Sequence, residues 1–349
     1  MIRLAKPLPT GSHTPHVHVV VPCYRYGMFL EGCVESIIRQ PGVRTTVHII
    51  DDASPDGSFS VAERLASLHP NVKAEKNDVN IGHIATYNKG LSRAESDYLV
   101  LLSADDQLAP GALQRAVALM ECHPEVGLVY GHPQTFDTEP RVSFSTRHSW
   151  SIWTGSNWID RQFRRGLSII YSPEAVVRTS LQHQVGYYLP DLPHSGDLEM
   201  WLRMAENASV GRINGPDQAY RRVHPASMMN SQFAGVVTDL YERRRAYEWF
   251  LRSETAPEAV RTRRAHIMNR RLAEEALGWA ADARRGGQSN SNLDEAVEFA
   301  LKIFPDASVL PMWMAASTDS KGGIWQAAMQ TRQTMADKLR WRRWRHLGN

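Results

Sequence analysis

The stretch that decides the fold closes the first third of the chain. It runs Asp97-Tyr98-Leu99-Val100-Leu101-Leu102-Ser103-Ala104-Asp105-Asp106. The apolar run from Tyr98 to Leu102 is too short for a typical helix and indicates a buried, parallel strand. Because ligands in open α/β sheets bind beyond the carboxyl ends of the strands, Asp105 and Asp106 suit a divalent cation and, with it, a diphosphate. The alternative is an aspartate that caps a helix beginning near Pro110.

The flanking segments alternate between strand and helix patterns. Strands are predicted at 17–21, 47–50, 72–75 and 126–130, and helices at 29–40, 58–68, 84–94 and 111–122. This βαβαβαβ order predicts a Rossmann-like, doubly wound, mostly parallel sheet.

The remainder of the chain is less regular and then becomes helical. We expect a β excursion or mobile loop at 135–156, a strand at 167–171, helices at 173–179 and 198–207, and an irregular segment at 219–229. Helical patterns dominate from residue 236. The sequence therefore predicts a flexible arm over 1–16, an α/β catalytic domain over 17–235, and an all-helical extension over 236–349.

Composition indicates a globular protein of the cytoplasm. The 349 residues are 42% hydrophobic and 22% charged, and the net charge of +3 is too small to imply nucleic acid. Cys23, Cys33 and Cys122 form no CxxC pair, which fits a reducing compartment. Neither an apolar run of 18 residues nor an N-terminal signal core is present. His13, His16 and His18 straddle a turn and a strand, so we do not favour a metal site there.

Four short motifs resemble, in their order and spacing, family 2 glycosyltransferases with the GT-A fold. They are Val19-Val20-Val21-Pro22-Cys23-Tyr24, Ile49-Ile50-Asp51-Asp52-Ala53-Ser54-Pro55-Asp56-Gly57, Asn80-Ile81-Gly82 with Asn88-Lys89-Gly90, and Ser103-Ala104-Asp105-Asp106. Each motif is weak alone. Together with two later pieces they extend the resemblance over residues 17–229.

The first three motifs correspond to the nucleotide side of such a site. The resemblance implies that a base packs near Pro22 and Tyr24 and that Asp52 accepts a hydrogen bond from it. Gly82 permits close backbone approach, and Asn88 joins the donor-binding set. The competing interpretations are an ordinary strand-to-helix turn, an N-cap for Asp52, which Asp56 would also supply, and a plain turn glycine.

Two positions depart from the family pattern. Tyr87 stands where family members often have Arg. Ser103 stands at the first position of the family's Asp-x-Asp motif, so Asp105 and Asp106 match its later aspartates. The resemblance implies that Asp105 contacts the donor sugar or ribose and that Asp106 binds Mn²⁺ or Mg²⁺.

The fifth motif, residues 194–203, contains Asp197 at the start of a predicted helix. The resemblance makes Asp197 the catalytic base, facing the acceptor hydroxyl. A helix N-cap is the alternative. Glu199 is expected to line the site or the helix surface.

The sixth motif, residues 219–227, matches a basic segment of related enzymes. In that register Arg221 and His224 match, although Arg222 can take the cationic role instead. The resemblance implies that His224 ligates the metal or contacts the diphosphate, while Arg offsets charge on the leaving group. A solvated basic loop is the alternative.

The sequence thus predicts an inverting, metal-dependent glycosyltransferase. It moves a sugar from a nucleotide-diphospho-sugar, UDP-sugar by preference, to an acceptor hydroxyl in polysaccharide, glycolipid or glycoconjugate biosynthesis. Ser103 and Tyr87 prompt one rival, a non-catalytic sugar-nucleotide-binding or scaffold protein. A second rival, a sugar-1-phosphate nucleotidyltransferase, needs a Gly-rich loop that Pro22-Cys23-Tyr24 does not provide.

The end of the chain suggests a location at a surface. Residues 338–346 contain five Lys or Arg, two Trp and no acidic residue. This pattern suits peripheral contact with the inner face of an anionic membrane, and a saccharide or lipid-linked acceptor there. An RNA or protein surface and a solvated tail are the alternatives, and no nucleic-acid partner is expected.

Overall fold

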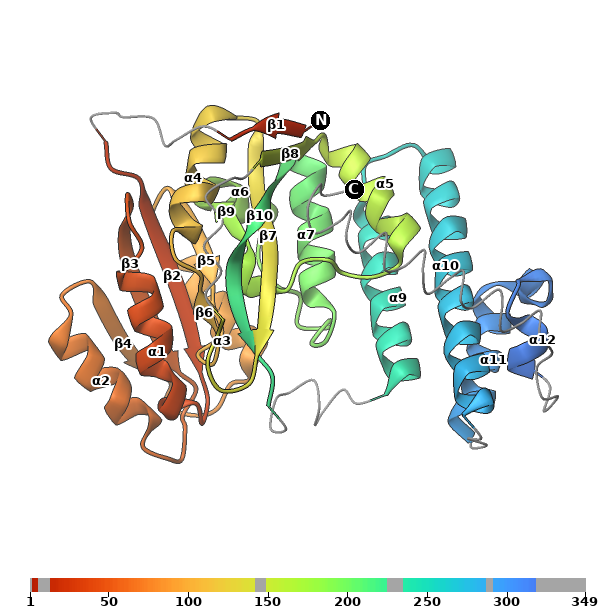
Figure 1. Ribbon diagram of the computed structural model, residues 1–349, viewed down its shortest axis with the longest axis horizontal. Helices are drawn as coiled ribbons and strands as arrows, with labels where there is room; N and C mark the ends of the chain where they lie inside the picture. Colours follow the sequence, from red (N-terminus) through yellow and green to blue (C-terminus); the bar gives the residue numbers. More distant parts are fainter. Residues whose placement is uncertain (1, 6–12, 142–148, 225–234, 287–290, 318–349) are drawn as a thin grey trace. The chain divides into compact units, whose positions relative to one another are not determined.

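The chain folds as two compact units, seen in the computed structural model in Figure 1. The structure describes residues 2–5, 13–141, 149–224, 235–286 and 291–317. The first unit holds the described residues up to 158 and those from 169 to 224. The second holds residues 159–168 and the helices from residue 235 onward. The sequence predicts a single division at residue 235, which would place residues 159–168 in the first unit. The structure places them in the second unit.

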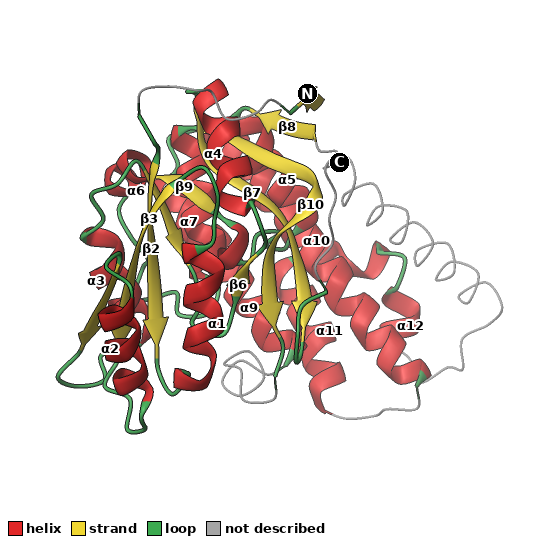
Figure 2. Ribbon diagram, turned by 60° about the vertical axis from the view of Figure 1, so that its left-hand side comes forward, coloured by secondary structure: helices red, strands yellow, loops and turns green. Residues whose placement is uncertain are grey.

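The first unit is built on one mixed sheet of the described strands (Figure 2). Its strands are β1 (Ile2–Leu4), β2 (His16–Cys23), β3 (Arg44–Asp51), β4 (Val72–Lys76), β5 (Tyr98–Leu101), β6 (Gln107–Leu108), β7 (Val126–Phe136), β8 (Ser149–Trp153), β9 (Val176–Arg178) and β10 (Ser209–Arg222). Their order is β1-β8-β10-β7-β9-β5-β2-β3-β4, and β6 pairs with β10. The block β5-β2-β3-β4 is parallel, as are β7 and β10, whereas β1, β6, β8 and β9 pair in antiparallel fashion.

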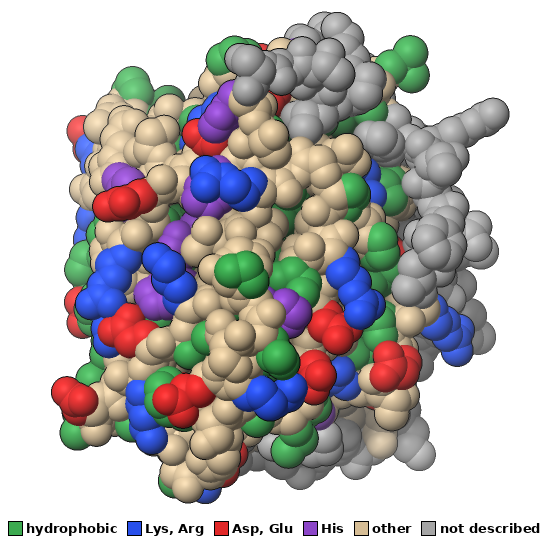
Figure 3. All heavy atoms as spheres, turned by 90° about the vertical axis from the view of Figure 1, so that its left-hand side faces the viewer, with side chains coloured by type: hydrophobic (Ala, Val, Ile, Leu, Met, Phe, Trp, Pro, Cys, Tyr) green, Lys and Arg blue, Asp and Glu red, His purple; other side chains and the backbone are tan. Residues whose placement is uncertain are grey.

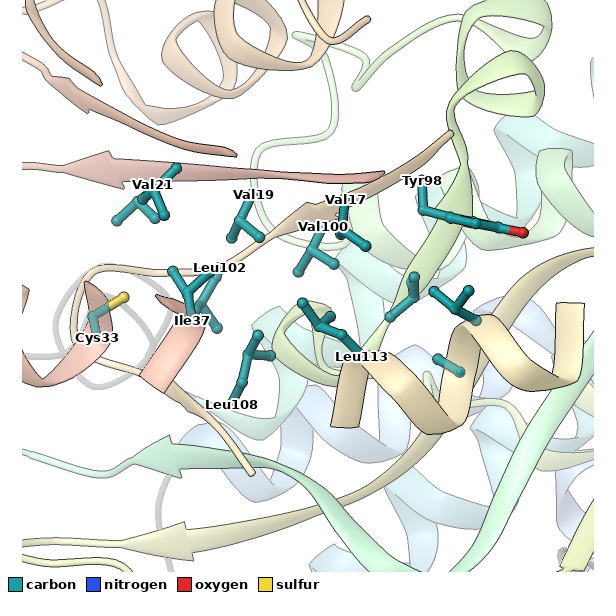
Figure 4. Close-up of a cluster of buried hydrophobic side chains, with 14 of the residues drawn as sticks. Val17, Val19, Val21, Cys33, Ile37, Tyr98, Val100, Leu102, Leu108 and Leu113 are labelled. Atoms are coloured by element: carbon teal, nitrogen blue, oxygen red, sulfur yellow. The ribbon is translucent and has the colours of Figure 1, made fainter. Parts of the chain in front are cut away.

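Helices cover both faces of this sheet. They are α1 (Gly27–Ile38), α2 (Ser58–Leu68), α3 (His83–Ser92), α4 (Ala112–Cys122), the start of α5 (Gly155–Arg165), the 3₁₀ turn η1 (Ser172–Glu174), α6 (Thr179–Val185) and α7 (Gly196–Asn207). The alternating Val17, Val19 and Val21 pack with apolar residues of α1 and α4 in the main core (Figure 4). The opposite face meets α3 so closely that a Cβ on Gly90 would lie 2.3 Å from a Val20 methyl group. The doubly wound α/β fold that the sequence predicts is confirmed.

The carboxyl ends of the parallel strands lie at one edge of the sheet. Strand β2 ends at Cys23 beside Asp51, the last residue of β3, which pairs in turn with Lys76 of β4. The turns that leave β2 and β3 place Arg25 and Ala53 at φ values of 61° and 56°. Side chains other than glycine rarely adopt this left-handed region, and such strain gathers at functional sites.

Four local expectations are wrong. Residues 167–171 form no strand. Within 173–179, η1 is followed by strand β9 and not by a helix. The irregular segment predicted from 219 begins inside β10, because Ala219 and Tyr220 pair with both β6 and β7. At the N-terminus, Ile2–Leu4 is not part of a loose arm, since it forms β1, the edge strand that pairs with β8.

The second unit consists of helices packed around α10 (Glu258–Arg285), which is a single helix. The others are α9 (Val236–Ser253), α11 (Ser291–Ile303), the 3₁₀ turn η2 (Pro305–Val309), α12 (Trp313–Ser317) and the end of α5. Small buried residues of α10, Ala273, Ala276 and Ala280, let its neighbours approach closely. Within the described ranges, no helix combines the length and apolar character needed to cross a membrane. The basic segment 338–346 lies outside these ranges.

Buried charges in the second unit are paired. The Arg264 guanidinium is 2% exposed and contacts the carboxylates of Glu254 and, at 2.8 Å, Asp160. Arg243 pairs with Asp239 at 2.8 Å and with Glu275 at 2.7 Å. On the face of the molecule in Figure 3, Lys and Arg, Asp and Glu, and His side chains lie intermixed. This differs from the single-sign stripe that nucleic-acid-binding surfaces present.

Candidate active site

Asp52 organises the loop that follows β4. Its Oδ1 accepts hydrogen bonds from Asn77 Nδ2 at 2.8 Å and from the Ile81 amide at 2.9 Å, and its Oδ2 accepts one from the Gly82 amide at 3.0 Å. Gly82 has φ of +85°, and nothing lies within 4 Å of a Cβ built there. Backbone conformation, and not space, therefore explains the glycine. Helix α2 has Gly57 as its N-cap, so Asp52 is not a cap.

The predicted base-packing residues lie at the end of β2. Pro22 is the next-to-last residue of the strand, paired with Ile50. Tyr24 follows the strand with 43% of its surface exposed, and the Arg25 guanidinium lies 5.8 Å from its ring centroid. The Asp52 amide donates to the Cys23 carbonyl at 2.8 Å, so the Tyr24 turn and Asp52 are neighbours.

Asp105, Asp106 and His224 form a cluster beyond β5. His224 Nε2 lies 3.2 Å from Asp105 Oδ2, and its ring contacts Tyr26 with centroids 5.5 Å apart. Burial, and then the Asp105 charge, raise the pKa of Asp106 well above its usual range. Helix α4 has Gly111 as its N-cap, so neither aspartate caps it.

The two arginines of β10 are placed differently. Arg222 donates its amide to Asp106 Oδ1 at 2.8 Å, and its guanidinium donates to the carbonyls of Asp105, Asp137 and Thr138. The Arg222 guanidinium also stacks on Phe29 and Phe136 at 4.6 and 4.3 Å. The Arg221 guanidinium lies 4.9 Å from the Tyr171 ring centroid. Arg222 thus holds the protein together, which leaves Arg221 as the better candidate for contact with a diphosphate.

Asp197 is the second residue of α7, and Ser195 occupies the N-cap position. The N-cap interpretation of Asp197 is therefore wrong. Burial raises the pKa of Asp197, whereas the hydroxyls of Tyr188 and Ser172 and the nearby His83 and His194 oppose that rise. The carboxylate also lies at the positive end of the helix dipole, which favours its ionised form.

Tyr87 connects these clusters. Burial raises the pKa of its hydroxyl, and the charges of Asp197, Asp105 and Asp106 raise it further. Its ring contacts those of His83 and Tyr188, with centroids 5.5 and 5.7 Å apart. The position that often holds Arg in the family thus carries a neutral phenol that these aspartates face.

Asn88 is engaged with another part of the chain. Its Nδ2 donates to the Tyr188 carbonyl at 2.8 Å, and its Oδ1 accepts from the Tyr188 amide at 2.9 Å. The structure therefore gives Asn88 a role within the protein, besides the donor contact expected of it.

The carboxylates suit a divalent cation by type but do not enclose one. Asp105 and Asp106 supply hard oxygen ligands and His224 an imidazole, which Mg²⁺ or Mn²⁺ accept. A cation there would offset the charge that burial disfavours on Asp106. Among the described residues, no three His, Cys, Asp or Glu side chains are grouped to hold a metal ion. Oxygens of a bound diphosphate would complete such a site.

Several site residues escape sequence reasoning. Asn77 donates a hydrogen bond to Asp52. It directly follows β4, and a polar residue at the end of a strand is only a weak sign of a functional role. Ser172 and Tyr188 face Asp197 from segments that carry no motif. Glu174, buried in η1, feels the charges of Asp106 and Asp197, and burial raises its pKa well above the usual range.

Comparison with known proteins agrees with this geometry. Residues 18–181 match the family model described as Glycosyl transferase family 2. The match covers a little under half of the chain. The matched segment contains most of β2, all of β3–β5 and the Asp105–Asp106 pair, whereas Asp197 and His224 lie beyond it.

Relatives in sequence extend the match at low identity. The uncharacterized protein MT1568 of Mycobacterium tuberculosis is 25% identical over 260 residues, covering 71% of this chain and 79% of that protein. The uncharacterized glycosyltransferase YibD of Escherichia coli is 24% identical over 199 residues, covering 52% and 55%. The putative glycosyltransferase EpsE of Bacillus subtilis is 31% identical over 124 residues, covering 35% and 45%. The chain therefore spans about half the length of the last two.

Solved structures share the fold. S. aureus TarS, crystallised with UDP-GlcNAc, superposes with a TM-score of 0.62 at 17% identity, covering 84% of this chain and 81% of that one. The mannosyltransferase PcManGT from Pyrobaculum calidifontis, in complex with GDP-Man and Mn²⁺, gives 0.55 at 18% identity, covering 90% and 88%. The predicted GT-A fold with a helical C-terminal part is confirmed.

Proposed function

We propose that this chain is an inverting glycosyltransferase that uses a nucleotide-diphospho-sugar donor. The observation that carries the proposal is the meeting of Asp197 with Asp105 and Asp106 around Tyr87, from segments about ninety residues apart. One carboxylate on the acceptor side and a pair on the diphosphate side are what a single displacement requires.

The nucleotide is assigned to the edge formed by Pro22, Tyr24 and Asp52. Asp52 can still accept one hydrogen bond, at Oδ2, beyond its three bonds within the protein, because each carboxylate oxygen can accept two. A uracil N–H is a suitable donor to it, and the exposed Tyr24 ring offers a stacking surface. Asp105 is assigned to the sugar or ribose.

The leaving diphosphate is assigned to Asp106, His224 and Arg221. Mn²⁺ or Mg²⁺ held by Asp106 and His224 would stabilise the charge that develops on the diphosphate. Arg221 adds positive charge at the same end of β10. Asp197 takes the proton from the acceptor hydroxyl as the new bond forms.

A saccharide or lipid-linked acceptor, in polysaccharide, glycolipid or glycoconjugate biosynthesis, is part of the same proposal. Its support is the basic, Trp-containing segment 338–346, which suits the inner face of an anionic membrane. Deleting residues from Lys338 onward should reduce sedimentation with anionic liposomes at low salt and leave donor hydrolysis unchanged. A full-length chain that never sediments would favour a soluble acceptor.

A donor screen tests the proposal. Thermal unfolding is followed with UDP-, GDP-, dTDP- and CMP-sugars, with Mn²⁺ or with EDTA, because a ligand that binds the folded state raises its stability. One sugar nucleotide should raise the Tm with Mn²⁺ and lose most of this effect with EDTA or in Asp106→Ala. The exposed Asp78→Ala serves as the control.

The screen also separates the rivals. Binding followed by slow hydrolysis of the donor supports an enzyme, and binding without turnover in any acceptor mixture supports a non-catalytic binding protein. No Tm shift with any sugar nucleotide contradicts the proposal.

A further inference from the structure

Tyr188 lies against the start of helix α7. Its side chain is 4% exposed, and a Cβ built on Gly196 would lie 3.2 Å from its Cδ1 atom. Its other side meets the Tyr87 ring of α3, with centroids 5.7 Å apart. The ring is thus packed between α3 and α7, directly beside the residue that precedes Asp197.

The backbone of Tyr188 is fixed separately from its ring. Asn88 of α3 binds both its amide and its carbonyl, with bonds of 2.9 and 2.8 Å. Because one side-chain amide both donates to and accepts from the backbone of Tyr188, that residue has little freedom to shift along α3. Asn88 therefore ties the Tyr188 segment to the half of the unit that carries the donor-side motifs.

The Tyr188 hydroxyl is buried, and no group among the described residues forms a hydrogen bond of regular geometry with it. The Tyr188 ring lies beside Gly196, the residue that precedes Asp197, and the Tyr188 hydroxyl opposes the rise in the pKa of Asp197. Burial and the Asp197 charge raise the pKa of Tyr188 well above the usual range, so the phenol stays protonated and can only donate toward Asp197. A buried hydroxyl without a regular partner carries a cost, which is recovered when the carboxylate turns to accept from it.

We propose that Tyr188 is a positioning residue for Asp197, held in place by Asn88. The phenol hydroxyl orients the carboxylate and keeps it ionised, so that it is ready to accept the acceptor's proton. This inference rests on the proposed function, because it presumes that Asp197 is the base. It assigns to Asn88 a purpose other than donor contact.

Other groups around Asp197 also affect its pKa. His83 of α3 and His194 before α7 favour its ionised form, and so does the Ser172 hydroxyl. Tyr87 and Glu174 also interact with its charge. All of them remain when only the Tyr188 hydroxyl is removed.

The test is the pH profile of kcat/KM for Tyr188→Phe, which keeps the ring and its packing. Without the hydroxyl, the hydrogen bond that the turned Asp197 carboxylate would accept cannot form, so the acidic limb should move upward by about one to two pH units. The KM for donor should stay within about twofold, because the nucleotide edge is untouched. Tyr187→Phe is the matched control: its hydroxyl pairs with His183 Nδ1 at 2.8 Å, and its profile should equal the parent's.

A double variant shows whether Tyr188 acts through Asp197. Tyr188→Phe should lower kcat in the parent but not in an Asp197→Asn background, since residues that act as a unit are not additive. An equal loss in both backgrounds would overturn the proposal, as would an unmoved acidic limb. If Tyr188→Phe does not fold, Asn88→Asp, which turns a carboxylate oxygen toward the Tyr188 carbonyl, must give the same upward shift.

The outcomes separate this inference from the proposed function. A chain in which Asp197→Asn retains parental transfer has no base at Asp197, and the proposed function fails. A chain in which Asp197→Asn is inactive but Tyr188→Phe has the parental pH profile keeps the function and loses only the role of Tyr188.

Discussion

Buried charges are handled differently in the two units. In the helical unit, burial lowers the pKa of Arg243, but Glu275 and Asp239 outweigh it and raise that pKa. In the sheet unit, burial raises the pKa of Asp106, Asp197 and Glu174, and no cation compensates fully. Charges that serve the fold are built with their partners. We infer that Asp106, Asp197 and Glu174 belong to a site that trades stability for chemistry, because strongly perturbed pKa values gather at functional sites.

Removing the charge of Asp197 should give the largest effect. Asp197→Asn keeps the size of the side chain but cannot accept a proton, so turnover to acceptor should fall by about 10²–10⁴-fold. Donor affinity by calorimetry should survive, and the free energy of unfolding should be unchanged or higher, because a buried charge is gone. Joint loss of affinity and stability would make Asp197 a structural residue.

Breaking a pair in the helical unit should have the opposite signature. Arg264→Ala strands Glu254 in the interior, so the free energy of unfolding should fall by about 3–5 kcal/mol. Replacing both residues by Leu should recover most of that loss. Urea unfolding measures both variants. If Arg264→Ala were as stable as the parent, the buried pair would not stabilise the helical unit, and the contrast with the sheet unit would fail.

Asp52 is a charged residue to which we assign two roles: it holds the loop after β4, and it binds the nucleotide. Asp52→Asn should weaken binding of the nucleotide by about 1.5–3 kcal/mol, the worth of a hydrogen bond to a charged group. It should also lower the free energy of unfolding, because an amide N–H would face one of the three donors that Asp52 now binds. Unchanged nucleotide affinity would leave Asp52 as a loop-holding residue alone.

Two glutamates of the sheet unit sharpen the comparison through pH. Glu174 has a folded pKa well above its ordinary 4.5, so the stability it contributes is present below pH 4.5 and is lost as pH rises. For Glu75, burial raises the pKa, but Lys89 and Arg93 outweigh it and lower the pKa to about 2. The stability that Glu75 contributes to the folded protein is present above pH 4.5 and is lost as pH falls toward 2.

The matched variants should therefore diverge. Glu174→Gln should gain stability over the parent as pH rises above 4.5, by at most about 1.4 kcal/mol per pH unit. Glu75→Gln should be less stable than the parent at pH 7, and that gap should narrow below pH 4.5. Urea unfolding between about pH 2 and 8 measures both, because the two windows lie on either side of pH 4.5. If the difference in unfolding free energy from the parent changed with pH in the same way for both variants, the opposite pKa shifts of Glu174 and Glu75 would be refuted.

The parallel half of the sheet and its strand-end aspartates were predictable because their signals are local. A β-branched or apolar run with Asp within a few residues of its end gives both the strand and the edge where the carboxylate lies, as for Asp52, Asp105 and Asp106. The start of α7 was equally visible, since Asp197 precedes a periodic run.

Contacts between distant segments were not predictable. Strand β10 contains Arg212, Asn214 and Pro216, which indicate a loop, yet β7 and β8 pair with it on either side and override that pattern with a bulge near Asp217. The Asn88–Tyr188 clamp joins positions 100 residues apart. Nothing near either residue signals the other.

The central claim is that one base performs one displacement. The anomeric configuration of the product tests it most directly, using the sugar nucleotide that most raises the Tm and an acceptor that supports turnover. The proton coupling constant at the new glycosidic centre is measured by NMR before the product can equilibrate. We predict inversion relative to the donor, such as a β-linked product from an α-linked donor. Retention would contradict a single-step role for Asp197.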